Sequence, residues 1–329
     1  MRFKNFPLFI VIIIIMITLF SCSSEMVSEQ KLVFGTVCKI TGDKKIPFKE
    51  IWNSLEDLEN KISMNQDSSE LSQVNDKAGI QKVEVSEETY NTVKEALYYS
   101  NLTEGYFNPV LGSVIQLWKD GPDFAVLPDP IAIQEGLKHT DVSKIKLTED
   151  GEKFFIYLED EGMKFDLGGI GKGIAADLVK KILQEHKINS ALINLGGNIY
   201  GVGHKDNNEK WNIGIQNPLD ERGAYLKIVS VDDKSVVTSG AYERNFIKDG
   251  VLYHHILDPR TGMSANNGII SSTIINESST ACDALSTACY VMGIDKATKL
   301  IKSLKGFEAI FVLESGEIVQ LLGDGNENY

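Results

Sequence analysis

The chain has 329 residues, with 33 Lys and Arg against 46 Asp and Glu, so its formal net charge at pH 7 is −13. This acidity argues against nucleic-acid binding, because such a surface repels polyanions. Four cysteines without a CxxC spacing indicate neither a zinc site nor a disulfide framework. With 43% apolar residues, the chain can form one large domain or two lobes.

The first 22 residues have the pattern of an export signal. Two basic residues precede an apolar run over 7–20, which is typical of a signal peptide covering 1–21. This run of about 14 residues is shorter than the roughly 20 needed to span a bilayer, so a retained anchor is the weaker alternative. Cys22 follows Leu-Phe-Ser, where bacterial lipoproteins carry the acylated cysteine, so we expect lipidation there. Cleavage without lipidation stays open.

Removal of residues 1–21 takes away two basic residues and no acidic ones. The mature chain would therefore carry 31 Lys and Arg against 46 Asp and Glu, a net charge of −15. This acidity argues against electrostatic binding of the domain to anionic lipid through a basic surface. The lipid on Cys22 is then the expected membrane attachment. We expect residues 22–30 to be a short tether and 31–329 to form the domain, at the bacterial inner membrane facing the periplasm.

The first part of the expected domain contains a strand, two helices and a loop. Residues 31–40 alternate between apolar and polar and predict a strand. A second helix is predicted to start at Ser86, whose hydroxyl can cap it, and to end near Gly105. Three prolines within 119–130 predict a surface loop. The first helix opens at Pro47 and has an apolar stripe at positions 48, 51, 52, 55, 58 and 62.

The remaining elements alternate irregularly between strands and helices. Residues 165–186 run from a glycine-rich loop into an amphipathic helix. Because several strand pairs are adjacent, we predict an α+β fold with mixed or antiparallel sheets, and not a doubly wound parallel sheet. Strands are predicted at 144–148, 153–158, 191–195, 211–216, 225–231, 236–239 and 269–275, helices at 279–292 and 295–304, and hairpin turns at Asp150-Gly151 and Ser315-Gly316.

The segment DLGGIGKG (166–173) could bind phosphate. Glycines let a backbone approach an anion closely, the helix that follows directs its positive end there, and Lys172 adds a charge. The segment matches neither the P-loop nor the GxGxxG pattern. A tight turn into a helix, with an exposed lysine, explains the same residues, so both interpretations stay open.

The segment ACDALSTACYVMG (281–293) could hold a metal. Asp283 and Thr287 are four residues apart, so on one helix they project from the same face. Carboxylate and hydroxyl oxygens are hard ligands of the kind that Mg²⁺ prefers. A capping or solvated pair is the alternative on spacing alone.

The segment YHHILDPRTG (253–262) combines two histidines with a turn. Asp258, Pro259 and Gly262 are residue types that favour turns, so they account for the turn without a functional role. They do not explain His254 and His255, and a neutral imidazole near a phosphate is a candidate for taking a proton from an attacking hydroxyl.

Together and in this order, the segments resemble the signature runs of the ApbE family of FAD:protein FMN transferases. The resemblance extends over about residues 31–315 and rests on no single segment. The matching runs are FGT (34–36), SELSQVN (69–75), GYFNPVLG (105–112), DLGGIGKGIAAD (166–177), INLGGNIYG (193–201), SGAYERNF (239–246), HILDPRTG (255–262) and DALSTA (283–288).

The resemblance implies a single α+β catalytic domain that binds FAD in a cleft and moves FMN from FAD onto a threonine or serine of an acceptor protein, releasing AMP. It assigns Mg²⁺ to Asp283, Thr287 and the Gly169 carbonyl, and the proton acceptor to His255, with His254 a weaker substitute. The acceptors implied are exported proteins of redox complexes. The residues implied to contact FAD are Phe34, position 65, Tyr106, Phe107, Asn108, Asp166, Lys172 and His255.

Two positions depart from the family pattern. Asn65 stands where an aromatic residue commonly packs against FAD, and Asn108 replaces an aspartate common in the GxFDP run. Loss of the aromatic face removes a stacking surface, and water could then replace the protein hydroxyl as nucleophile. Mg²⁺-dependent FAD pyrophosphatase activity is therefore the alternative to transfer, and a non-catalytic FAD-binding lipoprotein is a third hypothesis.

Overall fold

The computed structural model describes residues 26–119, 127–205, 208–221, 223–242 and 244–325. The predicted signal peptide, Cys22 and most of the predicted loop at 119–130 lie outside these ranges. In the part of the chain that is described, no helix has both the length and the apolar character needed to cross a bilayer.

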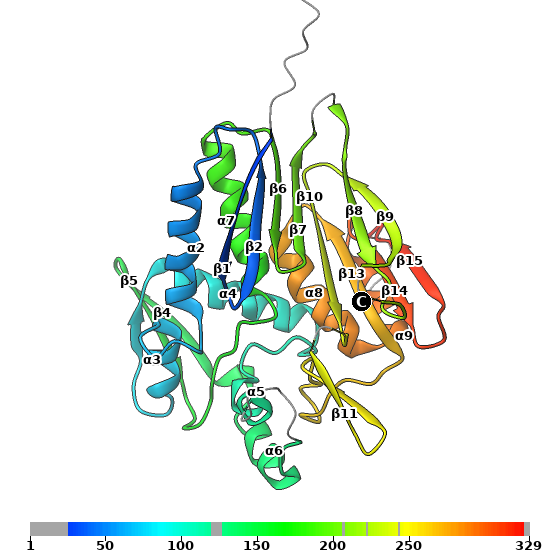
Figure 1. Ribbon diagram of the computed structural model, residues 1–329. Helices are drawn as coiled ribbons and strands as arrows, with labels where there is room; N and C mark the ends of the chain where they lie inside the picture. Colours follow the sequence, from blue (N-terminus) through cyan, green and yellow to red (C-terminus); the bar gives the residue numbers. More distant parts are fainter. Residues whose placement is uncertain (1–25, 120–126, 206–207, 222, 243, 326–329) are drawn as a thin grey trace, which may run out of the picture.

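One eight-stranded sheet organises the domain, and all of its neighbouring strands are antiparallel (Figure 1). Its central strands are covered on both faces, so even polar side chains of these strands, such as Ser271, Ser272 and Thr273, are buried. In spatial order the strands are β1 (Val27–Val33), β2 (Thr36–Gly42), β6 (Ser190–Leu195), β7 (Asn198–Gly203), β10 (Lys234–Gly240), β13 (Ile269–Asn276), β14 (Glu308–Leu313) and β15 (Ile318–Leu322).

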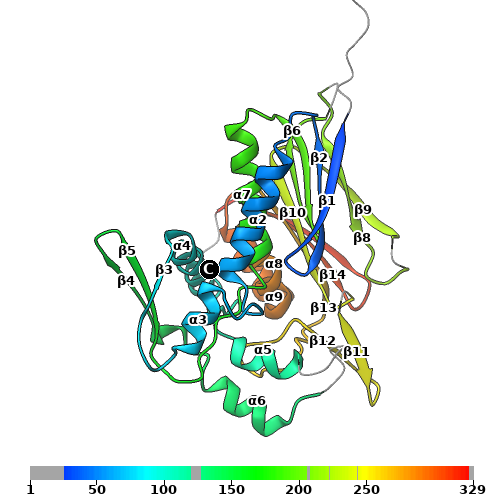
Figure 2. The same ribbon diagram turned by 60° about the vertical axis from the view of Figure 1, so that its left-hand side comes forward.

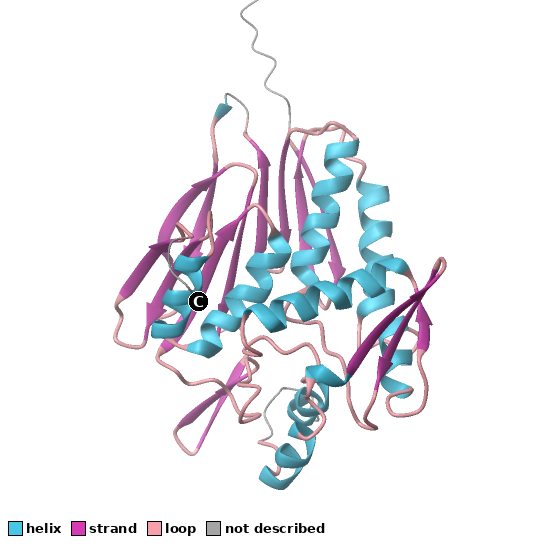
Figure 3. Ribbon diagram, turned by 180° about the vertical axis from the view of Figure 1, so that it is seen from behind, coloured by secondary structure: helices cyan, strands magenta, loops and turns pink. Residues whose placement is uncertain are grey.

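Helices cover one face of this sheet, and a two-stranded sheet covers the other (Figure 2). The view from behind shows the helical layer in front of the strands (Figure 3). The apolar stripe predicted from Pro47 onward is buried in this layer, as expected for an amphipathic helix. The helices are α2 (Phe48–Ile62), α4 (Glu87–Leu102), α7 (Gly171–Glu185), α8 (Ser279–Met292) and α9 (Ile294–Ser303), and the covering strands are β8 (Trp211–Gln216) and β9 (Tyr225–Val231).

Smaller elements lie at the ends of the helical layer. A three-stranded sheet of β3 (Val83–Val85), β5 (Lys153–Leu158) and β4 (Ile145–Asp150) lies near α3 (Glu70–Asp76). Below the large sheet in Figure 1, α5 (Gly112–Lys119) and α6 (Pro130–Leu137) lie beside the hairpin of β11 (Asn245–Lys248) and β12 (Val251–His254). This lower group has its own small core, which includes Trp118 and Leu257.

The predicted α+β class and antiparallel sheets are confirmed, and several elements agree to within a residue or two. Ser86 caps α4 by accepting a hydrogen bond from the Thr89 amide, as predicted, although the helix ends at Leu102 and not near Gly105. The strands over 211–216 and 225–231 and the helix over 279–292 have the predicted bounds.

The single strand predicted over 31–40 is wrong. The segment is a hairpin, because Phe34 and Gly35 adopt φ angles of +55° and +65° and reverse the chain between β1 and β2. Strand β1 begins at Val27, so four residues of the predicted tether, 27–30, belong to the sheet. The predicted loop also ends early, because Pro130 is the first residue of α6, where a proline lacks only an amide that the helix does not need.

Candidate functional site

The close crossing of α7 and α8 forms the centre of the site. Gly173 permits this approach, because a Cβ there would lie 2.6 Å from the Ser279 carbonyl oxygen and 2.8 Å from the Asp283 Cβ. The Gly173 amide donates to Asp283 Oδ2 at 2.8 Å, and the Asp283 residue is only 3% exposed. A buried carboxylate needs compensation, and here one oxygen receives it from the free amide at the start of α7.

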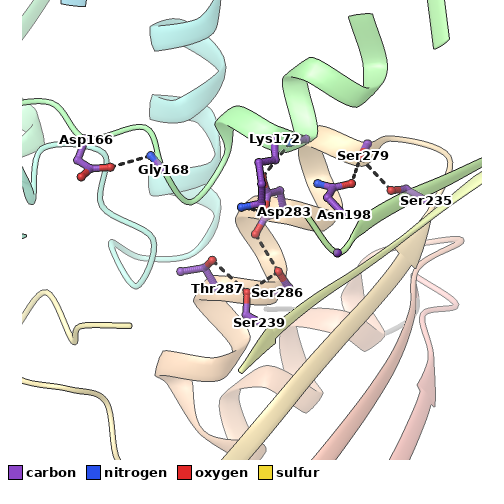
Figure 4. Close-up of polar contacts among 12 residues, drawn as sticks. Asp166, Gly168, Lys172, Asn198, Ser235, Ser239, Ser279, Asp283, Ser286 and Thr287 are labelled. Carbon is purple, nitrogen blue, oxygen red and sulfur yellow. Dashed lines mark hydrogen bonds and ion pairs between the residues drawn. The ribbon is translucent and has the colours of Figure 1, made fainter. Parts of the chain in front are cut away.

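Asp283 and Thr287, to which the resemblance assigns Mg²⁺, lie one turn apart on α8, near the start of α7 (Figure 4). A Cβ built on Gly169 would lie 3.5 Å from Thr287 Oγ1, so the glycine-rich loop borders the α8 hydroxyl. Ser239 Oγ from β10 lies 3.3 Å from Thr287 Oγ1 and 2.8 Å from Ser286 Oγ. The buried Asp283 carboxylate and the Thr287 hydroxyl are oxygen ligands of the kind that suits a hard divalent cation, and the glycine-rich loop lies beside them.

Lys172 supplies a positive charge next to this donor set. Its Nζ lies 3.8 Å from Asp283 Oδ1, which is too far for a hydrogen bond, and its side chain is 30% exposed. In the described part of the chain, Asp283 Oδ1 has this cation at 3.8 Å as its charged neighbour. Among the described residues, no group of three or more His, Cys, Asp and Glu side chains forms a conventional metal cluster.

Asp166 closes the glycine-rich loop. Its Oδ1 accepts a hydrogen bond of 2.7 Å from the Gly168 amide, and its own amide donates to the Pro109 carbonyl at 2.9 Å. The loop is thereby joined to the segment that contains Tyr106, Phe107 and Asn108. The structure therefore brings two of the predicted site segments together.

Asp177, which the sequence analysis did not single out, positions α8. Its carboxylate accepts hydrogen bonds from the amides of Ser279 (3.0 Å) and Thr280 (2.9 Å) and from the Thr280 hydroxyl. These are unpaired amides at a helix start, and a carboxylate there also interacts favourably with the helix dipole. Asp177 is the final residue of the run DLGGIGKGIAAD, so the sequence contained it. Without knowledge of the helix that packs against it, an aspartate on a helix is interpreted as solvent-exposed.

The two adjacent histidines have different environments. His254 is 3% exposed, its Nε2 lies 2.8 Å from the Ala265 carbonyl oxygen, and its Nδ1 accepts from the Ile256 amide at 3.3 Å. Burial lowers its pKa. With both ring nitrogens engaged inside the core, His254 is a structural residue.

His255 points out of the core. Its Nδ1 lies 3.3 Å from the Arg244 carbonyl oxygen, and because a carbonyl only accepts, Nδ1 is the donor and Nε2 keeps a free lone pair. The ring has an exposed edge, but the surrounding protein limits its hydration and lowers its pKa to about 4, and the positive charges of Arg244 and Lys172 act in the same direction. His255 is therefore a neutral imidazole at neutral pH.

The side chains of the segment Tyr106–Asn108 make contacts within the protein, so not all of them are available to a ligand. The ring of Phe107 borders the glycine-rich loop, since a Cβ on Gly169 would lie 3.2 Å from Phe107 Cε2. Asn108 donates to the Thr140 carbonyl and accepts from the Val110 amide, both at 2.9 Å. Both the nitrogen and the oxygen of the Asn108 side-chain amide are thus hydrogen-bonded to backbone groups. The position of Asn108 in the family run did not predict this structural role.

Phe34 and Asn65 lie in turns. Phe34, at the tip of the β1–β2 hairpin, is half-buried against the main core. Thr36 beside it approaches Gly196 so closely that a Cβ on Gly196 would lie 2.5 Å from the threonine side chain, which joins the FGT and INLGG segments. Asn65 lies in the connection between α2 and α3 with an exposed side chain.

Known proteins resemble this chain over most of its length. The sequence profile of the ApbE family matches residues 34–311. The FAD:protein FMN transferase of Treponema pallidum is 39% identical over 303 residues, which cover 87% of this chain and 84% of that protein. The FAD:protein FMN transferase of Klebsiella pneumoniae is 32% identical over 269 residues, covering 82% and 83%.

Solved structures agree with these sequence matches. The ApbE protein of Thermotoga maritima superposes with a TM-score of 0.81 at 33% identity, covering 90% of this chain and 97% of that one. The flavin transferase ApbE of Vibrio cholerae superposes with a TM-score of 0.79 at 28% identity, covering 92% and 98%. The sequence match, the fold and the segments that meet at the α7–α8 crossing lead to one conclusion, that this chain belongs to the ApbE family.

Proposed function

We propose that this chain is a Mg²⁺-dependent FAD:protein FMN transferase that attaches FMN to a threonine or serine hydroxyl of exported redox-complex proteins and releases AMP. The observation that carries the proposal is the buried Asp283 carboxylate beside Thr287, Lys172 and the glycine-rich loop in a member of the ApbE family. A site of this composition suits a pyrophosphate with a bound divalent cation.

Each residue has a role that its contacts support. Asp283, Thr287 and the Gly169 carbonyl would hold Mg²⁺, which when bound supplies Lewis-acid polarisation of the phosphoryl oxygens. Lys172 contributes a charge to the same phosphates, and the start of α7 directs its amides toward them. Asp166 keeps the loop closed through Gly168.

His255 would take the proton from the acceptor hydroxyl. Its pKa of about 4 keeps the imidazole neutral, and its Nε2 lone pair is free to accept. The hydroxyl oxygen forms a bond to the FMN-side phosphorus, and the bond from that phosphorus to the bridging oxygen breaks. AMP leaves with the bridging oxygen, and the FMN remains as a phosphoester on the acceptor.

The proposal is tested by incubating the purified mature protein with FAD, Mg²⁺ and an exported redox-complex subunit of the same organism. We expect the acceptor to gain the mass of one FMN while AMP appears, and EDTA to stop both. Bound but unchanged FAD in the presence of Mg²⁺ would instead leave the non-catalytic flavin-binding lipoprotein.

A second candidate function is FAD pyrophosphatase activity, which yields free FMN and AMP. The exposed amide side chain of Asn65 favours it, because no aromatic face is offered at that position to hold the flavin and restrict water. Replacement Asn65→Tyr should lower the rate of FMN release without acceptor and strengthen FAD retention. Unchanged values of both would remove Asn65 as a determinant.

We also propose that Cys22 carries the lipid that attaches the domain to the periplasmic face of the bacterial inner membrane. Strand β1 begins at Val27, so only residues 23–26 separate Cys22 from the fold. Four extended residues reach about 14 Å, which would keep the domain close to the membrane surface. Cells supplied with a labelled fatty acid should label the wild-type protein and not the Cys22→Ser variant, and an unlabelled wild-type protein would contradict lipid attachment.

A further inference from the structure

The glycine-rich loop is entered through a short extended segment, residues 164–166, whose backbone is hydrogen-bonded on two sides. On one side, the Gly112 amide donates to the Lys164 carbonyl at 3.0 Å, and the Asp166 amide donates to the Pro109 carbonyl at 2.9 Å. In an extended chain the backbone groups of successive residues point to opposite sides. The amide and carbonyl of Phe165, which lies between these two residues, therefore point away from the 109–112 run.

Asn75, near the end of α3, binds both of these backbone groups of Phe165. The Phe165 amide donates to Asn75 Oδ1 at 2.7 Å, and Asn75 Nδ2 donates to the Phe165 carbonyl at 3.1 Å. A side-chain amide carries a donor and an acceptor on one carbon, so it can pair with a peptide as a neighbouring strand would. Phe165 is fully buried, so leaving these backbone groups unpaired would cost free energy.

Helix α3 is a firm support for Asn75. The side chains of Leu71 and Val74 on this helix are buried in the main core. The Ser69 hydroxyl caps the helix by accepting a hydrogen bond of 2.9 Å from the Ser72 amide. The position of the Asn75 amide is therefore set by the packing of α3 and not by the loop that it contacts.

The residues that follow Phe165 in the chain form the loop of the candidate site. Asp166 Oδ1 accepts from the Gly168 amide at 2.7 Å and so closes the loop (Figure 4). A Cβ on Gly169 would lie 3.5 Å from Thr287 Oγ1, so the loop is packed against α8 and a small displacement changes this contact. A shift of the Phe165 backbone would therefore be transmitted to Gly169 through the closed loop.

We propose that Asn75 is a positioning residue, whose pairing with Phe165 sets the place of the glycine-rich loop and thereby the affinity of the site for a pyrophosphate with bound Mg²⁺. This inference rests on the proposed function. It gives a role to the SELSQVN run (69–75), for which the resemblance implied no ligand contact. Groups that orient the direct ligands of a metal affect its binding without touching it. Asn75 acts in this way, through the Phe165 backbone.

The test compares Asn75→Ala with a matched control in the same helix, Glu70→Ala. Glu70 Oε2 accepts from the Ser86 amide at 2.9 Å and from the Ser86 hydroxyl at 2.8 Å, so the control also removes two hydrogen bonds, but at the start of α4. Calorimetry of the mature proteins measures the binding of ADP, which carries a pyrophosphate, in the presence of Mg²⁺. The rate of AMP release from FAD gives the Mg²⁺ concentration for half-maximal activity. We expect Asn75→Ala to weaken ADP binding and to raise this Mg²⁺ concentration about tenfold, equivalent to about 1.4 kcal/mol, and Glu70→Ala to change both by less than about twofold.

Asn75→Asp is a second variant of the same shape, which keeps the acceptor for the Phe165 amide and loses the donor to the carbonyl. It should fold and show a smaller loss than Asn75→Ala in the same two quantities. A merely structural role predicts lower thermal unfolding midpoints with unchanged ADP binding and Mg²⁺ dependence, and this result would overturn the inference, as would an equal loss in Glu70→Ala. Wild-type protein that binds no ADP in the presence of Mg²⁺ would contradict the proposed function itself, and the inference with it.

Discussion

The candidate site has two ends, the α7–α8 crossing and the stack of Arg260 on Tyr106, and they consist of different chemical groups. The α7–α8 crossing consists of backbone amides, one buried carboxylate and glycines that allow close contact. The other end consists of large side chains from distant segments that support one another, with Arg260 stacked on Tyr106 and Trp118 donating to the Gly262 carbonyl. The first end depends on spacing along the chain, and the second depends on contacts that only the fold creates.

This difference determines how each end should respond to mutation. At the α7–α8 crossing a small change in side-chain size or charge should act strongly, because the helices have no room to adjust. At the stack of Arg260 on Tyr106 a single change should be partly tolerated, because several side chains support one another there. The predictions below separate the two ends, from the largest expected effect to the smallest.

Replacement Asp283→Asn should abolish Mg²⁺-dependent turnover, with a fall of about 10³-fold or more, since the metal supplies several kcal/mol to the transition state. The amide oxygen of Asn can still accept from the Gly173 amide, so the fold should be retained. Product analysis and a thermal melt measure the two effects. Turnover close to that of the wild type would remove Asp283 from the metal site.

Replacement His255→Gln should lower the rate of FMN transfer about 10²- to 10⁴-fold while the protein stays folded, because it removes the proton acceptor. His254→Gln is the matched neighbour and should act mainly on stability, since His254 is buried and hydrogen-bonded. Transfer rates and denaturant unfolding of both variants separate the roles. Equal loss of activity in two well-folded variants would contradict the assignment to His255 alone.

The lowered pKa of His255 also predicts a pH effect on stability. Between about pH 6.5 and pH 4 the unfolded chain binds a proton at this residue and the folded protein does not, so its contribution to stability decreases as pH falls through that window. His254 acts in the same direction. The decrease in unfolding free energy from pH 7 to pH 4.5 should therefore be smaller in His255→Gln than in the wild type. An identical pH profile would show that the histidine is not shielded.

Replacement Gly173→Ala should destabilise the protein by about 1–3 kcal/mol, because its Cβ would lie 2.6 Å from the Ser279 carbonyl oxygen. Gly171→Ala is the control in the same helix, where the nearest atom to a Cβ is Ile62 Cδ1 at 3.6 Å. There the loss of chain entropy in the unfolded state should stabilise by about 0.4–1 kcal/mol. Urea unfolding of both variants measures the change in unfolding free energy. Similar changes in Gly173→Ala and Gly171→Ala would show that the helices are not in close contact at Gly173.

Replacement Asn108→Asp should destabilise by about 1–2 kcal/mol, since a carboxylate cannot donate to the Thr140 carbonyl. Asn91→Asp adds the same charge on the exposed face of α4 and should have little effect. Denaturant unfolding compares them. A gain in stability at position 108 would mean that the site favours the aspartate common in the family run, and that the backbone bonds of Asn108 are dispensable.

The sequence indicated the local geometry of the α7–α8 crossing better than that of the stack of Arg260 on Tyr106, for a physical reason. Glycines, a capping serine and a four-residue spacing on one helix have local consequences, so the loop before α7 and the Asp283–Thr287 face could be inferred from position alone. The stack of Arg260 on Tyr106 joins residues more than 150 positions apart, and the local sequence around either residue does not predict the contact. The β1–β2 turn was missed because Phe34 adopts a φ angle that its residue type rarely takes.

The central claim is that FMN is transferred to a protein hydroxyl rather than to water. The most direct measurement is the ratio of FMN bound covalently to the acceptor to AMP released, with FAD limiting and the acceptor in excess. Transfer predicts a ratio near one, and the signal should vanish in Asp283→Asn. A ratio near zero, with free FMN equal to AMP, would contradict transfer and establish FAD hydrolysis as the activity.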